Sequence, residues 1–473
     1  MLTLADVLEA LSGTRLEAAS QVITEASIDS RQVIPGALFV ALPGERVDGH
    51  DFIGEAFQRG AHLALIQREI PLPYPVLDLR RGLPAGEFSP PELPFCLLVD
   101  DTLHALQQVA HFWRRKLQLT VVGITGSVGK STTKELVAEV LEQRYRTLKN
   151  PGNLNNEIGL PLTLLRLSEG HEVAVLEMGF YVPGEIALLC DLALPQIGVI
   201  TNVGTVHAER AGTQEAIARG KAELVQSLPP APEGVAILNY DDLWVREMAS
   251  QTNARVFFYG LDPKADIWAD EIEGLGLDGI RFRLHHRNET IHLRVPLIGR
   301  HSVHTVLRAV AVGLVQGLTW QELVNGLRSG RTQLRLVAVR SKNGALLLDD
   351  TYNASPESTL AALNLLDELD GRKVAVLGDM LELGPYEEIG HQMVGVRAAE
   401  VVDELVTVGA LGKLIAAAAR DAGLKAEDIT EFMDAQEAVE FLKTRLGERD
   451  VALVKGSHGV RMDRIVAALE FRK

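Results

Sequence analysis

Cysteine is scarce in this sequence: Cys96 and Cys190 are the only two among its 473 residues. Two thiols in apolar surroundings cannot form the disulfide framework of a secreted domain or a four-cysteine zinc site. Long apolar runs are also missing, because none approaches the roughly 20 residues that cross a bilayer. The first ten residues lack the positive charge and the cleavage site of a signal peptide. We therefore expect a cytoplasmic protein without membrane insertion.

Positive charge is in deficit as well, with 47 lysines and arginines against 63 aspartates and glutamates and a net charge of −16. No basic stripe exists that could release counterions from a nucleic acid, so this class of partner is excluded. The hydrophobic content of 47% and the length indicate a globular protein of about three domains, at ~150 residues each. An acidic chain that handles anionic substrates must gather its cations in a few places.

The most informative segment runs from residue 120 to residue 133. Its apolar, β-branched start predicts a buried strand, the glycines at 126 and 129 predict a tight turn, and a helical pattern opens at Lys130. Such a turn points several backbone N–H groups into one electropositive concavity, which suits phosphate. Lys130 would contact β- and γ-phosphates, and the Ser131 hydroxyl would bind Mg²⁺. The alternative is a plain glycine turn followed by an exposed lysine.

The spacing departs from the common phosphate-loop pattern G-x4-G-K-[ST], because Ile124 stands where the first glycine is expected. A shorter pattern, T-G-x-x-G-K-[ST]-T, describes the segment better, and few families use it. The residues expected to bind ATP here are Thr125, Gly126, Ser127, Val128, Gly129, Lys130, Ser131 and Thr132.

Strand and helix patterns alternate along most of the chain. Continuous apolar runs predict buried parallel strands at 120–124, 173–178, 197–201 and 235–238. Residues 255–295 alternate between polar and apolar positions, which predicts antiparallel strands with one solvated face. A further alternation starts near residue 330, with strands at 346–348, 373–377, 404–408 and 451–454.

These patterns predict an α/β protein of three domains. The first, residues 1–105, is a small mixed α/β domain whose segment 71–94 holds seven of the twenty prolines and is expected to be irregular. The second, 106–328, is a central P-loop mononucleotide-binding domain with a parallel sheet and an antiparallel subsheet. The third, 329–473, is Rossmann-like. In open sheets of this kind, ligands gather at the carboxyl ends of the strands.

Polar residues follow several of the predicted strands at those ends. Glu177 comes directly after an apolar run and is well placed to hold Mg²⁺, although a solvated strand-end glutamate would look the same. His207 lies in a glycine loop after another strand, where a phosphate or metal role and an ordinary loop histidine both fit. Lys221 has the spacing of a surface lysine on a helix. Two strands of the third domain end in polar segments, at residues 349–350 and 455–457. Each segment is either a binding loop or a plain connection from strand to helix.

An unusual asparagine-rich loop spans residues 150–161. Its four asparagines supply amide donors and acceptors without charge, which suits recognition of a sugar or a peptide. Turn formation alone would explain two of the four. In the first domain, the loops at 29–31 and 43–52 combine hydroxyl groups, cations and glycine, which is a weak sign of binding.

Seven segments spread over nearly the whole chain form a set: T-G-x-x-G-K-[ST]-T at 125–132, N-x-N-N-E-I-G-x-P at 153–161, the strand-end Glu177, N-x-G-x-x-H at 202–207, D-D-x-Y-N-A-x-P at 349–356, G-D-M-x-E-L-G at 378–384 and V-K-G-S at 454–457. Together they resemble the Mur ligases, the ATP-dependent enzymes that form the amide bonds of the peptidoglycan stem peptide.

Within this family, the D-S-R segment at 29–31, the D-G-H segment at 48–50 and the D-D-x-Y-N-A loop look like the enzyme that adds D-alanyl-D-alanine to UDP-N-acetylmuramoyl-tripeptide. The D-N-P-R motif of the enzyme that adds the third residue is absent. The resemblance implies that ATP converts a carboxylate into an acyl phosphate, which the dipeptide amine attacks. The alternatives are another Mur-type enzyme, a folylpolyglutamate-type ligase and, from a different class, a non-catalytic P-loop module.

The resemblance also implies ATP, two Mg²⁺ ions, a carbamylated Lys221, and a monomer that acts on small molecules. The catalytic residues it implies are Lys130, Glu177, His207 and Lys221, and the implied metal ligands are Ser131, Glu177, His207 and Lys221. The implied nucleotide contacts outside the phosphate loop are His304, Arg335 and Asp350. The implied substrate contacts are Ser30, Arg31, Asp48, Gly49, His50, Asn153, Asn155, Asn156, Tyr352, Asn353, Lys455 and Ser457.

Two places depart from the family pattern. The adenine-contacting helix usually opens G-R-H-N-x-x-N, whereas this chain has G-R-H-S-V-H at 299–304, so we assign Ser302 and His304 to the positions of the asparagines. A P-G-R turn is expected before the third domain and is replaced by Q-L-R, in which Arg335 keeps the charge.

Overall fold

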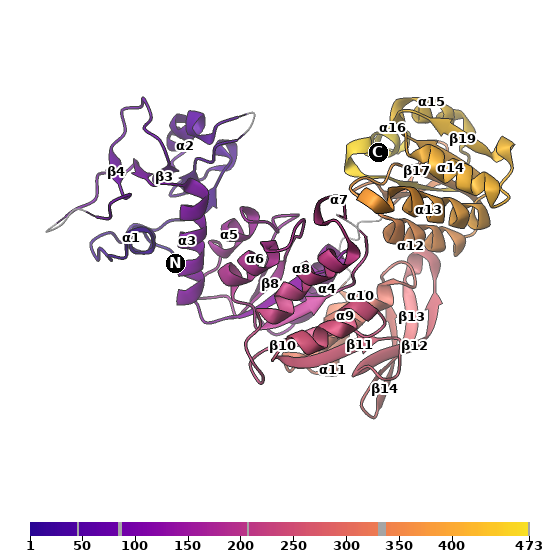
Figure 1. Ribbon diagram of the computed structural model, residues 1–473, viewed down its shortest axis with the longest axis horizontal. Coiled ribbons are helices and arrows are strands. Elements are labelled where there is room, and N and C mark those ends of the chain that lie inside the picture. Colours follow the sequence, from indigo (N-terminus) through magenta and orange to yellow (C-terminus); the bar gives the residue numbers. More distant parts are fainter. Residues whose placement is uncertain (45–46, 84–87, 206–207, 330–336, 472–473) are drawn as a thin grey trace.

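The computed structural model describes residues 1–44, 47–83, 88–205, 208–329 and 337–471. Their strands form three separate sheets, and Figure 1 shows these in sequence order along the longest axis of the molecule. The predicted α/β class with three domains is therefore confirmed, while the domain limits at residues 105 and 328 stay predictions.

The first sheet has five short parallel strands in the order β1-β2-β3-β5-β4. They are β1 (Ala26–Ser27), β2 (Leu38–Val40), β3 (Leu63–Ile66), β4 (Val76–Asp78) and β5 (Phe95–Leu98), accompanied by helices α1 (Leu4–Ser12) and α2 (Ile53–Gln58). The prediction that residues 71–94 are wholly irregular is wrong, because β4 lies within them. Its three residues follow Pro75, whose carbonyl accepts from the Cys96 amide at 2.9 Å, so the prolines flank the pairing without interrupting it.

Helix α3 (Thr102–Lys116) crosses the expected boundary near residue 105 without a break. Asp101 caps its start by accepting from the His104 amide. The Thr102 hydroxyl at this end donates to the Ala41 carbonyl of the first domain at 3.0 Å. At the other end the Trp113 indole donates to the Leu167 carbonyl of the central domain at 2.9 Å. One continuous helix therefore joins the two domains.

The central sheet has nine strands in the order β14-β13-β12-β11-β10-β9-β6-β8-β7. Their bounds are β6 (Thr120–Thr125), β7 (Thr147–Lys149), β8 (Val173–Glu177), β9 (Ile197–Ile200), β10 (Val235–Asn239), β11 (Arg255–Gly260), β12 (Ile267–Gly274), β13 (Ile280–His286) and β14 (Glu289–Val295). The helices are α4 (Lys130–Leu141), α5 (Gly159–Leu164), α6 (Glu185–Ala193), α7 (Ala208–Ala211), α8 (Gln214–Gln226), α9 (Leu243–Glu247), α10 (Ser302–Val315) and α11 (Trp320–Arg328).

Both faces of this sheet are covered, as the apolar runs predict. On β6, Val121 belongs to the core shared with α6 and α8, whereas Val122 and Ile124 belong to the core shared with α4 and α10. The phosphate-loop strand β6 lies between β8 and β9, so the ends of three parallel strands meet at one edge.

The prediction of antiparallel strands throughout residues 255–295 is only partly right. Strand β11 pairs parallel with β10, and β12 also begins parallel to β11. The antiparallel pairing is confined to β12, β13 and β14. The reason is that residues 256–259 form a continuous apolar run beneath α10, typical of a covered parallel strand, and polar alternation dominates only after them.

The third sheet has six strands in the order β15-β16-β20-β17-β18-β19, of which only β15 is antiparallel to its neighbour. The strands are β15 (Val337–Arg340), β16 (Leu346–Asp350), β17 (Arg372–Gly378), β18 (Glu404–Val408), β19 (Ile429–Phe432) and β20 (Asp450–Lys455). The helices are α12 (Pro356–Asp367), α13 (Glu387–Val401), α14 (Gly412–Asp421), α15 (Ala435–Arg445) and α16 (Asp463–Leu469). The four strands predicted for this region are all present.

Short 3₁₀ helices complete the chain at Ser30–Gln32, Gly49–Phe52, Met248–Gln251, Gly276–Asp278, Gly384–Tyr386, Ala426–Asp428 and His458–Val460. Among the residues described, no helix combines the length and the apolar character that crossing a membrane requires.

A buried carboxylate connects the first helix to α3. The Oδ1 atom of Asp6 accepts from Arg15 and from Lys116, each at 2.8 Å. Burial alone would raise the pKa of Asp6, but hydrogen bonds from Lys116, Thr3 and Arg15 outweigh it and lower the pKa to about 2. Because the folded-state pKa lies below that of the unfolded chain, the ionised carboxylate stabilises the fold.

We expect Asp6→Asn to lower the free energy of unfolding by about 2 kcal/mol at neutral pH. This stabilisation is complete above the unfolded pKa of about 4 and is lost as the pH falls toward 2. Urea unfolding of wild type and variant between pH 7 and pH 3 should therefore show a difference that shrinks with acid. A difference of constant size over this range would contradict the argument.

Candidate active site

The phosphate loop connects β6 to α4 in a tightly fixed conformation. At Gly126 the backbone has φ +145°, and a Cβ atom there would lie 1.8 Å from the Thr201 hydroxyl, so only glycine fits. Gly129, with φ +84°, immediately precedes the first residue of α4. The start of α4 therefore follows the loop directly, and the backbone N–H groups and dipole of a helix N-terminus suit an anion.

Asn202, at the end of β9, holds the loop from the side. Its carbonyl accepts from the Ser127 amide at 3.0 Å, and its side-chain Oδ1 accepts from the Val128 amide at 2.9 Å. Sequence reasoning included Asn202 in a motif but assigned it no role. A strand-end asparagine close to a glycine loop was the available signal.

Lys130 and Ser131 make different contacts at the start of α4. The Lys130 ammonium donates to the carbonyls of Gly126 and Ser127, at 2.8 and 3.2 Å, so it lies across the loop. The Ser131 hydroxyl donates to Oε2 of Glu177 at 2.7 Å. A hydroxyl and a buried carboxylate thus converge beside the phosphate loop, and both are oxygen ligands of the kind that Mg²⁺ prefers.

The asparagine-rich loop positions this carboxylate. Asn155 donates to Oε1 of Glu177 at 2.9 Å, and Asn150 accepts from the Glu177 amide at 2.9 Å. The Lys134 ammonium, itself buried, fixes the loop by donating to the carbonyls of Asn150 and Gly152 at 2.8 and 3.2 Å. Lys134 was missed by sequence reasoning, and Asn150 was considered only as one of the loop's four asparagines, since the roles of both depend on contacts between segments.

The other two asparagines of the loop have more local surroundings. Asn156 accepts from the Gly159 amide at 2.9 Å at the start of α5. The backbone carbonyl of Asn153 accepts from the Asn155 amide at 2.8 Å, and this residue is exposed. Part of the loop's asparagine content is therefore explained by the fold of the loop itself.

Lys221, on α8, is fully buried, which overturns the reading of its spacing as a surface lysine. Its ammonium nitrogen lies 4.6 Å from the centre of the Phe180 ring and has no hydrogen-bond partner among the described residues. Burial, and then the nearby charge of Lys130, lower the pKa of Lys221 well below its usual value. A lowered pKa favours the uncharged form of an amine, which is the nucleophilic form.

Two predicted site residues lie outside the described residues, namely His207 and Arg335. Within the described part of the chain, no group of three or more histidine, cysteine, aspartate or glutamate residues forms a metal cluster. The oxygen pair of Ser131 and Glu177 still fits one Mg²⁺, because this ion commonly takes few protein ligands and keeps its other positions for water and phosphate.

A cavity of about 180 Å³ extends from the phosphate loop to the third domain. Its wall includes Ser127 to Thr132 of the loop and Ile298, His301, Ser302 and Thr305 near the start of α10. The third domain contributes Asp350, Asn353, Lys455 and residues of α12. Lys455 is buried and donates to Asp350 at 2.5 Å and to the Asn353 carbonyl at 2.9 Å. These three predicted residues therefore lie in one cavity with the loop.

The remaining described residues predicted for the third domain and for α10 do not line this cavity. Ser457 accepts from the Leu381 amide at 2.9 Å, and Tyr352 is exposed. His304 is paired with Asp241 at 2.8 Å and does not line the cavity. Counting along G-R-H-N-x-x-N places the second asparagine at residue 305, so our assignment of that position to His304 is wrong, and Thr305 occupies the cavity wall.

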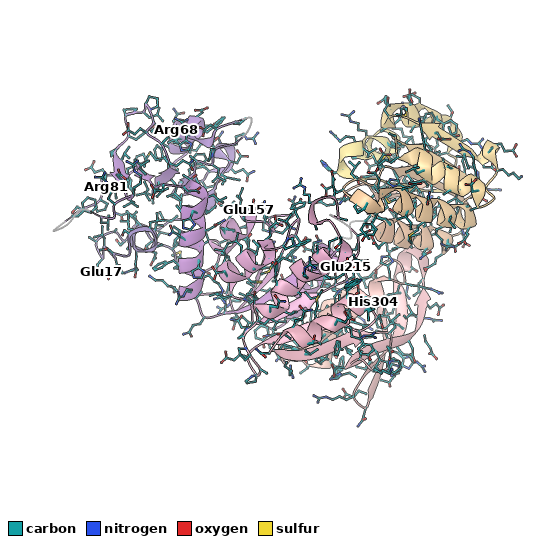
Figure 2. All side chains as sticks on the ribbon, viewed as in Figure 1. Glu17, Arg68, Arg81, Glu157, Glu215 and His304 are labelled. Atoms are coloured by element: carbon teal, nitrogen blue, oxygen red, sulfur yellow. The ribbon has the colours of Figure 1, made fainter. Side chains whose placement is uncertain are left out.

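The residues predicted to bind the other end of the substrate lie on the first domain. Ser30 donates to Glu55 at 2.9 Å, Arg31 pairs with Asp29 at 2.8 Å, and the imidazole of His50 contacts Asp48 at 2.6 Å. Gly49 packs against backbone, since a Cβ there would lie 2.7 Å from the Leu42 amide nitrogen. Figure 2 shows Arg68, which pairs with Asp48, on a different domain from His304. The structure does not bring this group together with the phosphate loop.

Comparison with known proteins gives three successive matches along the chain. The sequence pattern described as "Mur ligase family, catalytic domain" matches residues 22–77, "Mur ligase middle domain" matches 124–313, and "Mur ligase, glutamate ligase domain" matches 330–458. The UDP-N-acetylmuramoyl-tripeptide–D-alanyl-D-alanine ligase of Bacillus subtilis is 36% identical over 95% of this chain and 93% of its own length.

Solved structures agree. A crystal structure of MurF from Acinetobacter baumannii superposes with a TM-score of 0.83 at 30% identity, covering 98% of this chain and 97% of that one. MurF ligase from Thermotoga maritima in complex with ADP superposes with a TM-score of 0.78 at 29% identity, covering 94% of this chain and 96% of that one. On its sequence and on its three-domain architecture, the chain belongs to the Mur ligase family.

Proposed function

We propose that this protein is an ATP-dependent ligase that joins D-alanyl-D-alanine to UDP-N-acetylmuramoyl-tripeptide during peptidoglycan synthesis. The observation that carries the proposal is the convergence of the phosphate loop, the Ser131–Glu177 pair and the Asp350–Lys455 pair around one cavity. The similarity to ligases with this named activity, over more than nine-tenths of the chain, supports it.

The chemistry explains why such a site is needed. A carboxylate resists attack by an amine because it is anionic and would have to expel oxide. Transfer of the ATP γ-phosphoryl group to the tripeptide carboxylate gives an acyl phosphate. The dipeptide amine then attacks its carbonyl carbon, and the C–O bond to phosphate breaks as the amide forms. Positioning and charge neutralisation supply most of the catalysis in phosphoryl transfer.

The described residues fit distinct parts of this reaction. The loop amides and Lys130 would bind the β- and γ-phosphates, and Ser131 and Glu177 would hold a Mg²⁺ ion that neutralises charge on them. Asp350 and Lys455 would act from the third domain on nucleotide or dipeptide, as would Asn353. The first domain, with Ser30, Arg31 and the loop at 48–50, would bind the UDP end. We further propose that the protein acts on these small molecules as a monomer in the cytoplasm.

Release of ADP tests the proposal directly. With ATP, Mg²⁺ and UDP-N-acetylmuramoyl-tripeptide, we expect D-alanyl-D-alanine to support ADP release at least tenfold faster than D-alanine, L-glutamate, L-lysine or diaminopimelate. Lys130→Ala should reduce the rate more than tenfold by removing a phosphate contact. Lys264→Ala, which removes an exposed lysine of the same domain, is the matched control and should leave it unchanged.

Each result of this assay has a clear meaning. Faster turnover with a single amino acid would identify another Mur-type or folylpolyglutamate-type ligase. ADP release by Lys130→Ala within tenfold of wild type, with circular dichroism showing an intact fold, would remove Lys130 from the mechanism.

Lys221 is proposed to carry a carbamate that holds a second Mg²⁺ together with His207. Its amine is buried, has no hydrogen-bond partner among the described residues and has a lowered pKa, which fits this modification because an uncharged amine attacks carbon dioxide and releases one proton. We expect protein incubated with ¹³C-bicarbonate and Mg²⁺ to show a carbamate signal by ¹³C NMR. The signal should be missing from Lys221→Ala and present in Lys264→Ala. Its absence from wild type would exclude the carbamate.

A further inference from the structure

Arg308, on α10, is a buried cation directly behind the phosphate loop. Its side chain is 4% exposed. The guanidinium donates to the hydroxyls of Thr133 at 2.9 Å, Thr305 at 2.8 Å and Tyr259 at 3.3 Å. A Cβ placed on Gly129 would lie only 3.3 Å from its Nη2 atom, so the guanidinium packs against the loop backbone.

The hydroxyl partners of Arg308 extend its contacts to both ends of the loop. Thr133 donates to the Gly129 carbonyl at 2.6 Å, where the loop meets α4. The Tyr259 hydroxyl lies 2.9 Å from the Thr201 carbonyl, and Thr201 is the residue that packs against Gly126. A single side chain thereby fixes the distance between the helix start and the end of β9.

Arg308 makes its direct contacts with uncharged groups, including the face of the Tyr259 ring at 5.6 Å. In the described part of the chain, its hydrogen-bond partners are neutral hydroxyls, and no carboxylate forms an ion pair with it. Burying an unpaired cation costs several kcal/mol, so a folded chain that contains one needs a compensating anion or dipole. The phosphate loop, against whose Gly129 the guanidinium packs, offers a place for such an anion.

A second buried arginine, Arg114, shows the hydrogen-bond partners that are typical of a purely structural role. Arg114 is also 4% exposed, but its donors contact the carbonyls of Ala193 at 2.8 Å and Leu117 at 3.0 Å. Those carbonyls belong to the C-terminal ends of α6 and α3, where the helix dipole places partial negative charge. Arg114 therefore donates to the negative ends of two helices, whereas Arg308 donates to neutral hydroxyls.

We propose that Arg308 is a positioning residue of the nucleotide site, which fixes the phosphate loop and supplies positive potential for the nucleotide's phosphates. This inference rests on the ATP site in the proposed function. It requires that the contribution of Arg308 to the binding free energy increases with the number of phosphates on the ligand, because Arg308 attracts their negative charge.

Calorimetric titration of ATP, ADP, AMP and adenosine into the whole protein, with Mg²⁺, tests this requirement. We expect Arg308→Met to weaken ATP about tenfold, ADP and AMP progressively less, and adenosine less than about twofold. Arg308→Lys should recover most of the ATP affinity, because it keeps the charge. Arg114→Met is the matched control; it should lower the melting temperature but leave all four dissociation constants within about twofold of wild type.

Equal weakening of all four ligands, or no weakening of ATP, would overturn the inference and leave Arg308 a structural residue. If Arg308→Met does not fold, Arg308→Gln removes the charge while keeping polar contacts and is subject to the same comparison. Failure of the wild type to bind ATP would instead contradict the proposed function.

Discussion

The hydrogen bonds to Glu177 are the contacts on which the arrangement of the central domain depends. Its carboxylate accepts from Ser131 of the phosphate-loop helix and from Asn155 of the asparagine-rich loop, and its backbone amide donates to Asn150. Three segments that are distant in the sequence are thereby held around one buried negative charge. A charge of this kind is tolerated only where donors or a cation satisfy it, so the same contacts that stabilise the loop also prepare a metal site.

Much of the fold follows from local patterns in the sequence. Apolar runs identified the buried parallel strands of the central and third domains, and the glycine turn before Lys130 identified the start of α4. The failures have physical causes. Strand β4 is only three residues long and lies among prolines, and β11 is an apolar run next to alternating strands, so neither produced a distinct signal.

The sequence allowed prediction of those active-site residues that stand at the ends of strands. Sequence reasoning placed residues 350 and 455 after separate strands but could not pair them, because strand order and register are tertiary properties. In the structure β16 and β20 are neighbours in a register that opposes Asp350 to Lys455. Likewise, the burial of Lys221 depends on how α8 packs on the sheet, and the role of Arg308 depends on hydroxyls from three different elements.

The continuity of α3 has a consequence for the length of the substrate that carries the carboxylate. A single apolar core includes residues of the first sheet, α3 and one face of the central sheet. The first domain therefore cannot rotate freely relative to the central domain, which carries the phosphate loop. The span between the loops at 29–31 and 48–50 and the Ser131–Glu177 pair is therefore set by the protein. If the first domain binds one end of the substrate that carries the carboxylate, this fixed span selects substrates by their length. A substrate that is too short cannot reach the first-domain loops and the Ser131–Glu177 pair at the same time.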